Sequence, residues 1–130
     1  MYLLDTNICI AILKDNATVV SQFQSKYQDC YLTTLVLAEL YKGVYCSTKI
    51  NQNLTGLNQL ASYLPIIDFD QQAAIEFGKI QSELRQIGKP TGEIDALIAA
   101  VARSRQDILV TNNTKHFINI PNLQLENWFN

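Results

Sequence analysis

Residues 2–7 read YLLDTN, an apolar segment that ends directly on an acid. Its length and its polar boundary predict a short buried strand that ends at Asp5. A helical pattern follows at residues 8–14, and either Asp5 or Asn7 would serve as its N-cap. Asp5 therefore lies where a core strand meets a helix, a place where an unpaired charge is costly.

Strand and helix patterns alternate along the rest of the chain. Buried strands are predicted at residues 30–33, 64–68 and 107–111, with a short fifth strand at an edge over 122–128. Helices are predicted at residues 8–14, 17–27, 35–46, 50–64, 71–87 and 93–104. The last of these is apolar on most sides and is expected to be buried. We therefore expect an α/β fold, a three-layer α/β/α sandwich with a mostly parallel sheet of four to five strands.

The composition suits one domain of 130 residues with a single core. A formal net charge of -2 does not favour a strongly basic nucleic-acid binder, although local patches matter more than the total. No apolar run has the length of a membrane span, and no secretory leader is recognisable. The spacings of Cys9, Cys30 and Cys46 match no zinc or redox motif, which indicates buried free thiols in a reducing cytoplasm.

Several polar side chains are expected at one edge of the sheet. Parallel strands end at a common edge, where the following helices begin and where ligands bind. Asp5 ends the first strand, and Asn112 and Asn113 follow the fourth. Asp95 lies in the first turn of the last long helix, and Glu39 lies about one turn into the helix after the second strand. Three carboxylates and two amides are therefore expected at one rim.

Each acid also has an explanation that involves no ligand. Asp95 suits the first turn of a helix, and Asp5 would serve as a simple cap. Glu39 is harder to explain in this way, because its sequence neighbours are apolar. Clustered carboxylates repel each other, and a divalent cation relieves that repulsion. Oxygen ligands without nearby His or Cys favour Mg²⁺ or Mn²⁺, which activate water and offset charge on a phosphodiester.

Four segments together resemble the motifs of one family. They are LLDTNICI at residues 3–10, LAELYKG at 37–43, GEIDALIAA at 92–100, and LVTNNTKHF at 109–117 followed by LENW. In this order and spacing the sequence resembles the PIN-domain ribonucleases, specifically the VapC-like toxins of type II toxin–antitoxin pairs. The resemblance extends over the whole chain and implies a single PIN domain over residues 1–130.

The resemblance also implies roles for residues. Asp5, Glu39 and Asp95 match the acids that hold the metal, and Asn113 stands where many members of the family have a fourth catalytic acid. Asn113 therefore leaves open whether one or two metal ions bind. Glu93, two residues from Asp95, is expected to face elsewhere on its helix.

Four polar residues are expected to support these ligands. Thr6 and Asn7 would orient Asp5 or a coordinating water, with helix capping as the alternative for Asn7. Thr111, at the end of a strand, would either bond a carboxylate or have no role, and Asn112 lies beside Asn113.

The activity implied by the resemblance is Mg²⁺-dependent hydrolysis of RNA that leaves a 5′-phosphate and a 3′-hydroxyl. Single-stranded or loop RNA, including tRNA, is the expected substrate. The expected partners are a VapB-like antitoxin, which would fill an apolar groove and block the acids, and a second copy in a homodimer. The alternatives within the family are a housekeeping RNA-processing nuclease and a degenerate PIN domain that binds RNA without cutting it.

Other classes fit less well. A phosphatase of the haloacid type needs a second Asp where Asn7 stands, and a phospho-receiver needs paired acids and a late Lys that are missing. His116, the single histidine, is expected to be a surface or capping residue. Lys42 would either bind a substrate phosphate or pair with Glu39. The remaining cations are scattered, so solubility is their default role, although some would suit an RNA path.

Overall fold

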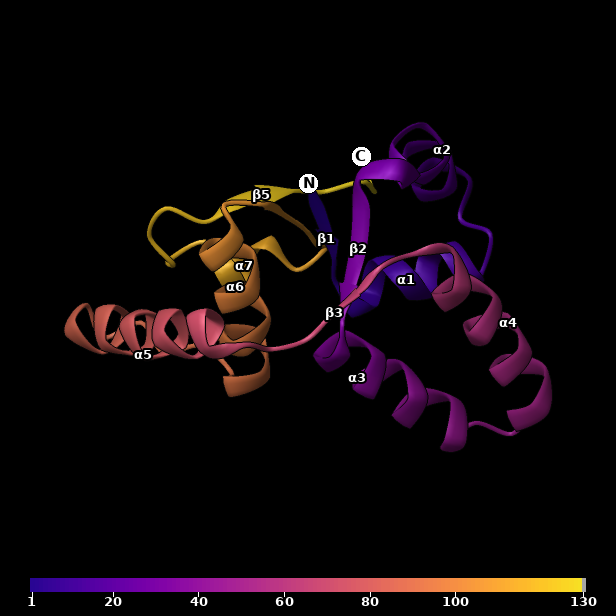
Figure 1. Ribbon diagram of the computed structural model, residues 1–130, viewed down its shortest axis with the longest axis horizontal. Coiled ribbons are helices and arrows are strands. Elements are labelled where there is room, and N and C mark those ends of the chain that lie inside the picture. The colour runs from indigo at the N-terminus through magenta and orange to yellow at the C-terminus, as the bar shows by residue number, and fades with distance from the viewer. Residues whose placement is uncertain (130) are drawn as a thin grey trace.

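A five-stranded parallel sheet forms the centre of the computed structural model, which describes residues 1–129 (Figure 1). Its strands are β1 (Tyr2–Leu4), β2 (Cys30–Thr33), β3 (Ile66–Ile67), β4 (Ile108–Val110) and β5 (Gln124–Glu126), in the order β3-β2-β1-β4-β5. Every neighbouring pair is parallel. All five strands therefore end at the same edge, and β1 lies in the middle.

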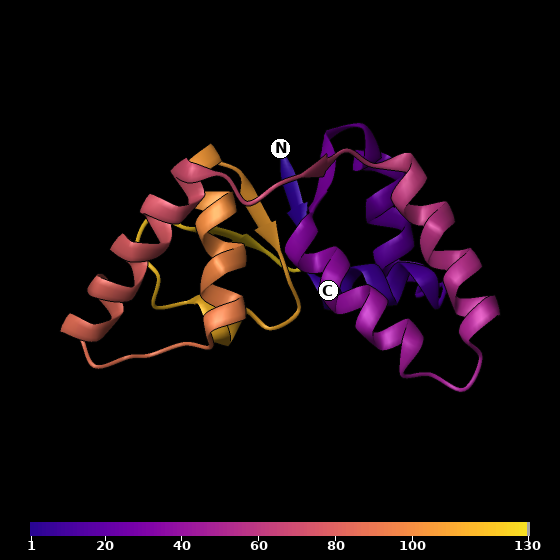
Figure 2. The same ribbon diagram turned by 60° about the horizontal axis from the view of Figure 1, so that its bottom comes forward.

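Helices cover both faces of this sheet. One side carries α1 (Thr6–Leu13), α2 (Ala17–Lys26), α3 (Thr34–Tyr45) and α4 (Ile50–Tyr63), and the other carries α5 (Gln71–Gln86), α6 (Glu93–Arg105) and α7 (Thr114–Phe117) (Figures 1 and 2). The expected three-layer α/β/α sandwich is confirmed, and the sheet is parallel throughout. Neither α7 nor the short 3₁₀ helix at Tyr27–Asp29 was expected, because such short turns have no periodic signal.

The outer strands are shorter than the sequence patterns. β3 covers two residues rather than 64–68. Pro65 has no N–H to donate, but its carbonyl accepts a 3.0 Å hydrogen bond from the backbone N–H of Leu32. β5 pairs with β4 alone, so the expected edge strand is present.

A single residue, Asp5, separates the first strand from the first helix. Asp5 has an extended backbone, and its side chain accepts a hydrogen bond from the backbone N–H of Thr6, so Asp5 is the N-cap of α1. The alternative, Asn7 as cap, is wrong, because Asn7 already lies inside the helix. Thr33 caps α3 in a similar way, with its hydroxyl 3.1 Å from the backbone nitrogen of Val36. Each of these helices therefore starts directly at the strand edge.

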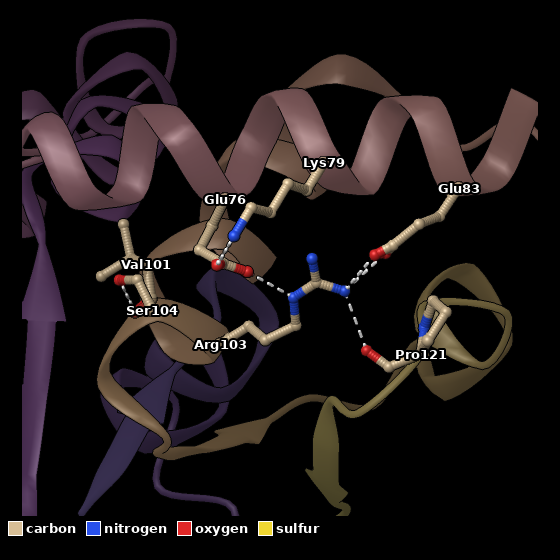
Figure 3. Close-up of polar contacts among 7 residues, drawn as sticks. All are labelled: Glu76, Lys79, Glu83, Val101, Arg103, Ser104 and Pro121. Carbon is tan, nitrogen blue, oxygen red and sulfur yellow. Dashed lines mark hydrogen bonds and ion pairs between the residues drawn. The ribbon is translucent and has the colours of Figure 1, made fainter.

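An ion-pair network joins α5 to α6, on the face of the sheet opposite α1 to α4 (Figure 3). Arg103 on α6 donates from Nε to Glu76 at 2.6 Å and from Nη1 to Glu83 at 2.8 Å, both on α5. Nη1 also donates to the carbonyl of Pro121 at 3.0 Å. The Arg103 side chain is only 10% exposed, so this network is largely withdrawn from solvent.

The core and the cysteines follow the sequence patterns with one exception. α6 buries Ala96, Ile98 and the run 99–102, as expected of a helix that is apolar on most sides. Cys9 and Cys30 are buried free thiols, but Cys46 is exposed, because it lies beyond the last turn of α3. Among residues 1–129, no helix combines the length and apolar character that crossing a membrane requires.

Candidate active site

The carboxylate of Asp5 lies at the end of the central strand and is only 4% exposed. Its Oδ1 accepts a hydrogen bond from the backbone N–H of Thr6 at 2.8 Å. Its Oδ2 accepts from the hydroxyl of Thr111 at 2.8 Å and from the side-chain amide of Asn7 at 3.1 Å. Three uncharged donors therefore hold this carboxylate in one orientation without neutralising it.

Asn7 and Thr111 connect the end of β1 to the end of β4. The Asn7 amide also donates to the Thr111 hydroxyl at 3.3 Å, and the Asn7 carbonyl oxygen accepts from the backbone N–H of Asn112 at 2.9 Å. The backbone N–H of Asn113 donates to the Thr111 hydroxyl at 3.0 Å. Thr111 is fully buried, so this network forms a rigid support behind Asp5.

The side chains of Asn112 and Asn113 are not part of that support. Both residues are exposed, and the Asn112 side chain accepts a bond from Asn127 at 3.3 Å. The Asn113 side chain forms no hydrogen bond within residues 1–129, although the residue lies at the N-cap position of α7. The structure thus brings the backbone of both residues, and not their side chains, to the network behind Asp5.

Glu39 approaches the same edge from α3. Its Oε1 accepts a hydrogen bond from the Thr6 hydroxyl at 2.6 Å, and the residue is half-buried. Thr6 therefore links Asp5, through its backbone, to Glu39, through its side chain. Lys42 forms no ion pair with Glu39 or with any other acid in residues 1–129.

Asp95 lies in the first turn of α6 and faces α7. Its Oδ2 is 3.2 Å from Nδ1 of His116, and its side chain is 30% exposed. Glu93 is exposed, in agreement with its expected position away from the other acids. This contact with His116 was not predicted from the sequence. The signal for it was the short interval between the end of β4 and His116, which keeps this residue at the strand edge.

The acids influence one another electrostatically. Burial raises the pKa of Asp5, and the charge of Asp95 raises it further, against the lowering effect of the three hydrogen bonds. Burial also raises the pKa of Asp95, with a contribution from Glu39, while His116 acts in the opposite direction. No Lys or Arg in residues 1–129 forms an ion pair with Asp5, Glu39 or Asp95. The site therefore has excess negative charge that a bound cation would relieve.

The donor set suits a hard cation, but its present geometry is not that of a bound metal. No three Asp, Glu, His or Cys side chains in residues 1–129 form a group that could hold a metal ion as they stand. Glu39 is turned to Thr6, and Asp95 is turned to His116. Both side chains are partly exposed. The expectation that no His lies near the acids is wrong, because His116 contacts Asp95. The three carboxylates remain typical ligands of Mg²⁺ or Mn²⁺.

Known proteins share this arrangement of sequence and fold. The family model of the PIN domain matches residues 2–123. Ribonuclease VapC2 of Rickettsia felis is 42% identical over 131 residues, which cover 98% of this chain and 98% of the relative. The tRNA(fMet)-specific endonuclease VapC of Shigella flexneri is 37% identical over 128 residues, which cover 98% and 97%.

A solved structure is similar over the same extent. One chain of the DNA-bound VapBC complex of Salmonella typhimurium matches with a TM-score of 0.93 and 35% identity, over 98% of this chain and 97% of that chain. The protein therefore belongs to the PIN-domain family and, within it, to the VapC ribonucleases. The family resemblance of the four sequence motifs is confirmed.

Proposed function

We propose that this chain is a single-domain, Mg²⁺-dependent endoribonuclease toxin of a VapBC-type pair, with Asp5, Glu39 and Asp95 as the metal ligands. The observation that carries the proposal is the buried Asp5 carboxylate, held by uncharged donors and accompanied by two acids instead of a cation. A structural carboxylate in such a position is normally paired with a cation. Its RNA substrate would place the protein in the cytoplasm.

The residues of the chain would divide the work as follows. A bound Mg²⁺ would activate a water and offset charge on the scissile phosphate. Asp5 is already oriented by Thr6, Asn7 and Thr111, so it would bind without further ordering. Glu39 would exchange its bond with Thr6 for the metal.

The fourth position of the family motif supports one firmly held metal ion rather than two. Asn113 adds no charge, and its side chain is exposed at the start of α7. An amide oxygen still ligates a cation or its water, which would be the catalytic contribution of Asn113.

The RNA substrate is proposed to be tRNA or another RNA with an accessible loop. The 37% identical relative from Shigella flexneri is named as a tRNA(fMet)-specific endonuclease. Unpaired bases in loops are also the part of a folded RNA that proteins reach most easily.

The partners are proposed to be a VapB-like antitoxin and a second copy of the chain. The similar solved structures include VapBC complexes from several bacteria. A largely apolar groove of about 520 Å³ lies between α1, α3 and α4 and has Glu39 in its wall, so an inserted antitoxin segment would cover this acid. Co-elution of the co-expressed pair, with loss of nuclease activity, tests this partner. Light scattering of the free chain tests the homodimer.

The nuclease proposal is tested by cleavage of total tRNA with the purified chain, free of antitoxin. We expect cleavage in Mg²⁺, no cleavage in EDTA, and at least about 100-fold slower cleavage by Asp5→Asn. Asp15→Asn is the matched control, because Asp15 is an exposed acid in the turn after α1. A wild-type chain that binds RNA but never cuts it would support the degenerate PIN domain instead. Cleavage that a cognate antitoxin does not inhibit would support the housekeeping nuclease.

A further inference from the structure

A second hollow opens beside Asp95 on the side away from the antitoxin groove. It has a volume of about 370 Å³ and lies between the α5–α6 loop, the start of α6, and α7. Its wall includes Lys89, Lys115, His116 and Asp95, and the buried Leu84 contributes to it from α5. We call this hollow the Lys89–Lys115 cavity. It shares Asp95 with the candidate metal site.

The two lysines of this cavity have no acidic partner. Neither Lys89 nor Lys115 lies within 4.0 Å of a carboxylate oxygen in residues 1–129, whereas Lys26 and Lys79 both form ion pairs. Both cavity lysines are exposed. Their ammonium groups are therefore free to bind an anion that enters the cavity.

The wall that carries the lysines is fixed to the candidate active site. The hydroxyl of Thr91, in the α5–α6 loop, donates a 2.8 Å hydrogen bond to the backbone carbonyl of His116 on α7. The ring of His116 in turn contacts Asp95. Gly88 has a φ of 65°, which favours glycine, and Pro90 further restricts the loop. The loop and α7 thus form one connected surface next to Asp95.

The start of α6 adds to the attraction for an anion. Gly92 is the N-cap and has no side chain to satisfy the free backbone N–H groups of the first turn. Glu93, in the same turn, is exposed and opposes this effect. The two lysines and the partial positive charge of the helix start together exceed the two negative charges of Glu93 and Asp95.

We propose that the Lys89–Lys115 cavity binds a backbone phosphate of the RNA next to the scissile phosphate. This proposal rests on the proposed function, because the bound phosphate is identified as the neighbour of the phosphate that is cleaved at the metal site. With the scissile phosphate at the metal site beside Asp95, the next phosphate along the RNA would lie close to Lys89 and Lys115. Such contacts position the strand without reading its sequence, so the cavity sets affinity rather than base preference.

Salt-dependent RNA binding tests this cavity directly. Binding of a short fluorescent single-stranded RNA is measured in EDTA, where cleavage is not expected, for the wild type and for Lys89→Gln/Lys115→Gln. Each lost phosphate contact lowers the magnitude of the slope of log K against log salt by about 0.7. The cavity is proposed to hold one phosphate, so we expect the slope of the double variant to be smaller by about 0.7. Lys26→Gln/Lys79→Gln, with the same change in net charge, should keep the wild-type slope within about 0.3.

Cleavage kinetics in Mg²⁺ provide the second readout. We expect the KM of Lys89→Gln/Lys115→Gln to rise about tenfold with kcat within about twofold, since the lost contact would be made equally in ground and transition states. Lys89→Arg/Lys115→Arg should restore most of the binding, which separates charge from folding.

The outcomes distinguish this proposal from the nuclease proposal. An unchanged salt slope and KM in the cavity variant, beside RNA cleavage by the wild type, would overturn the cavity and leave the nuclease. A reduced slope with no cleavage by the wild type would overturn the nuclease and retain the phosphate site. Failure of the wild type to bind RNA at any salt concentration would overturn the cavity as well.

Discussion

The hydroxyl of Thr111, at the end of β4, donates a 2.8 Å hydrogen bond to the carboxylate of Asp5, at the end of the neighbouring β1. The two residues are 106 positions apart, and both are buried. Parallel pairing of β1 with β4 brings their ends together, so the sheet itself determines the orientation of this carboxylate. The fold and the site are therefore coupled through one hydroxyl group.

Thr111→Val should lower RNA cleavage without disrupting the core. Valine has nearly the same shape, but it removes a donor to Asp5 and the acceptor for Asn7 and Asn113. Loss of such a supporting bond typically costs about 10–100-fold in activity or metal affinity. Single-turnover cleavage and Mg²⁺ titration measure both effects.

The matched control for this variant is Thr18→Val, on the exposed face of α2. It should leave cleavage within about twofold of the wild type. Full activity of Thr111→Val would show that the hydroxyl does not orient Asp5 for the reaction.

Asp95→Asn should stabilise the metal-free protein at neutral pH. The pKa of Asp95 is raised in the folded state by burial, with a further contribution from Glu39. Its charge therefore opposes folding when no cation is bound. Urea unfolding in EDTA should give a higher midpoint for Asp95→Asn than for the wild type. Glu93→Gln, which removes an exposed acid from the same helical turn, is the matched control and should not reproduce the gain.

The pH dependence of the stability difference between Asp95→Asn and the wild type follows from the raised pKa of Asp95. A carboxyl group with a raised folded pKa favours folding most below its unfolded pKa of about 4, and this advantage is lost as pH rises through the folded pKa. The stability gap between Asp95→Asn and the wild type should thus be small in acid and widest at neutral pH. Added Mg²⁺ should narrow the gap by stabilising the wild type alone. A gap that is independent of pH would contradict this explanation.

Arg103→Met should destabilise the protein and leave the chemistry intact. The variant leaves Glu76 and Glu83 without their arginine partner in a network that is largely withdrawn from solvent (Figure 3). We expect a loss of about 2 kcal/mol in the free energy of unfolding, below the range for fully buried pairs because both acids are partly exposed. Urea unfolding measures the loss, and kcat at a temperature well below the Tm should remain within about twofold.

The Arg103 network also makes the stability of the protein more sensitive to acid. The hydrogen bond from Arg103 lowers the pKa of Glu76, so its contribution to stability is present above the unfolded pKa and is lost as pH falls through the folded pKa. Arg103→Met should therefore show a weaker loss of stability than the wild type as the pH falls below about 4. Lys79→Met is the control and should have a smaller effect, because Lys79 is exposed, its Nζ lies 3.6 Å from Glu76, and it lowers the pKa of Glu76 less than Arg103 does.

Sequence periodicity was sufficient to predict the five strands and the six longer helices in their order along the chain. Asp5 was predicted to lie at the sheet edge because its strand is short, apolar and bounded by polar residues. The same local pattern could not decide between Asp5 and Asn7 as the N-cap of α1, because the pattern does not give the exact residue at which the strand ends and the helix begins. Periodicity also says nothing about four-residue helices, so α7 was missed.

The sequence did not predict side-chain rotamers or contacts between residues that are far apart in the chain. The short interval after β4 places His116 at the strand edge, but it does not show that the ring contacts Asp95, because the contact depends on how α7 packs beside α6. The same is true of Thr6, whose hydroxyl bonds Glu39 on a helix 33 residues further along the chain. The sequence also did not show that Asn113 contacts Thr111 through its backbone nitrogen, while its side chain makes no cap hydrogen bond.

The most direct measurement of the central claim is calorimetric titration of Mn²⁺ into the metal-free chain. We expect one firm site in the wild type, with affinity at least about tenfold weaker in each of Asp5→Asn, Glu39→Gln and Asp95→Asn. Glu93→Gln should bind as the wild type does. Wild-type affinity in any of the three variants, or no binding by the wild type, would contradict a metal site formed by these three carboxylates.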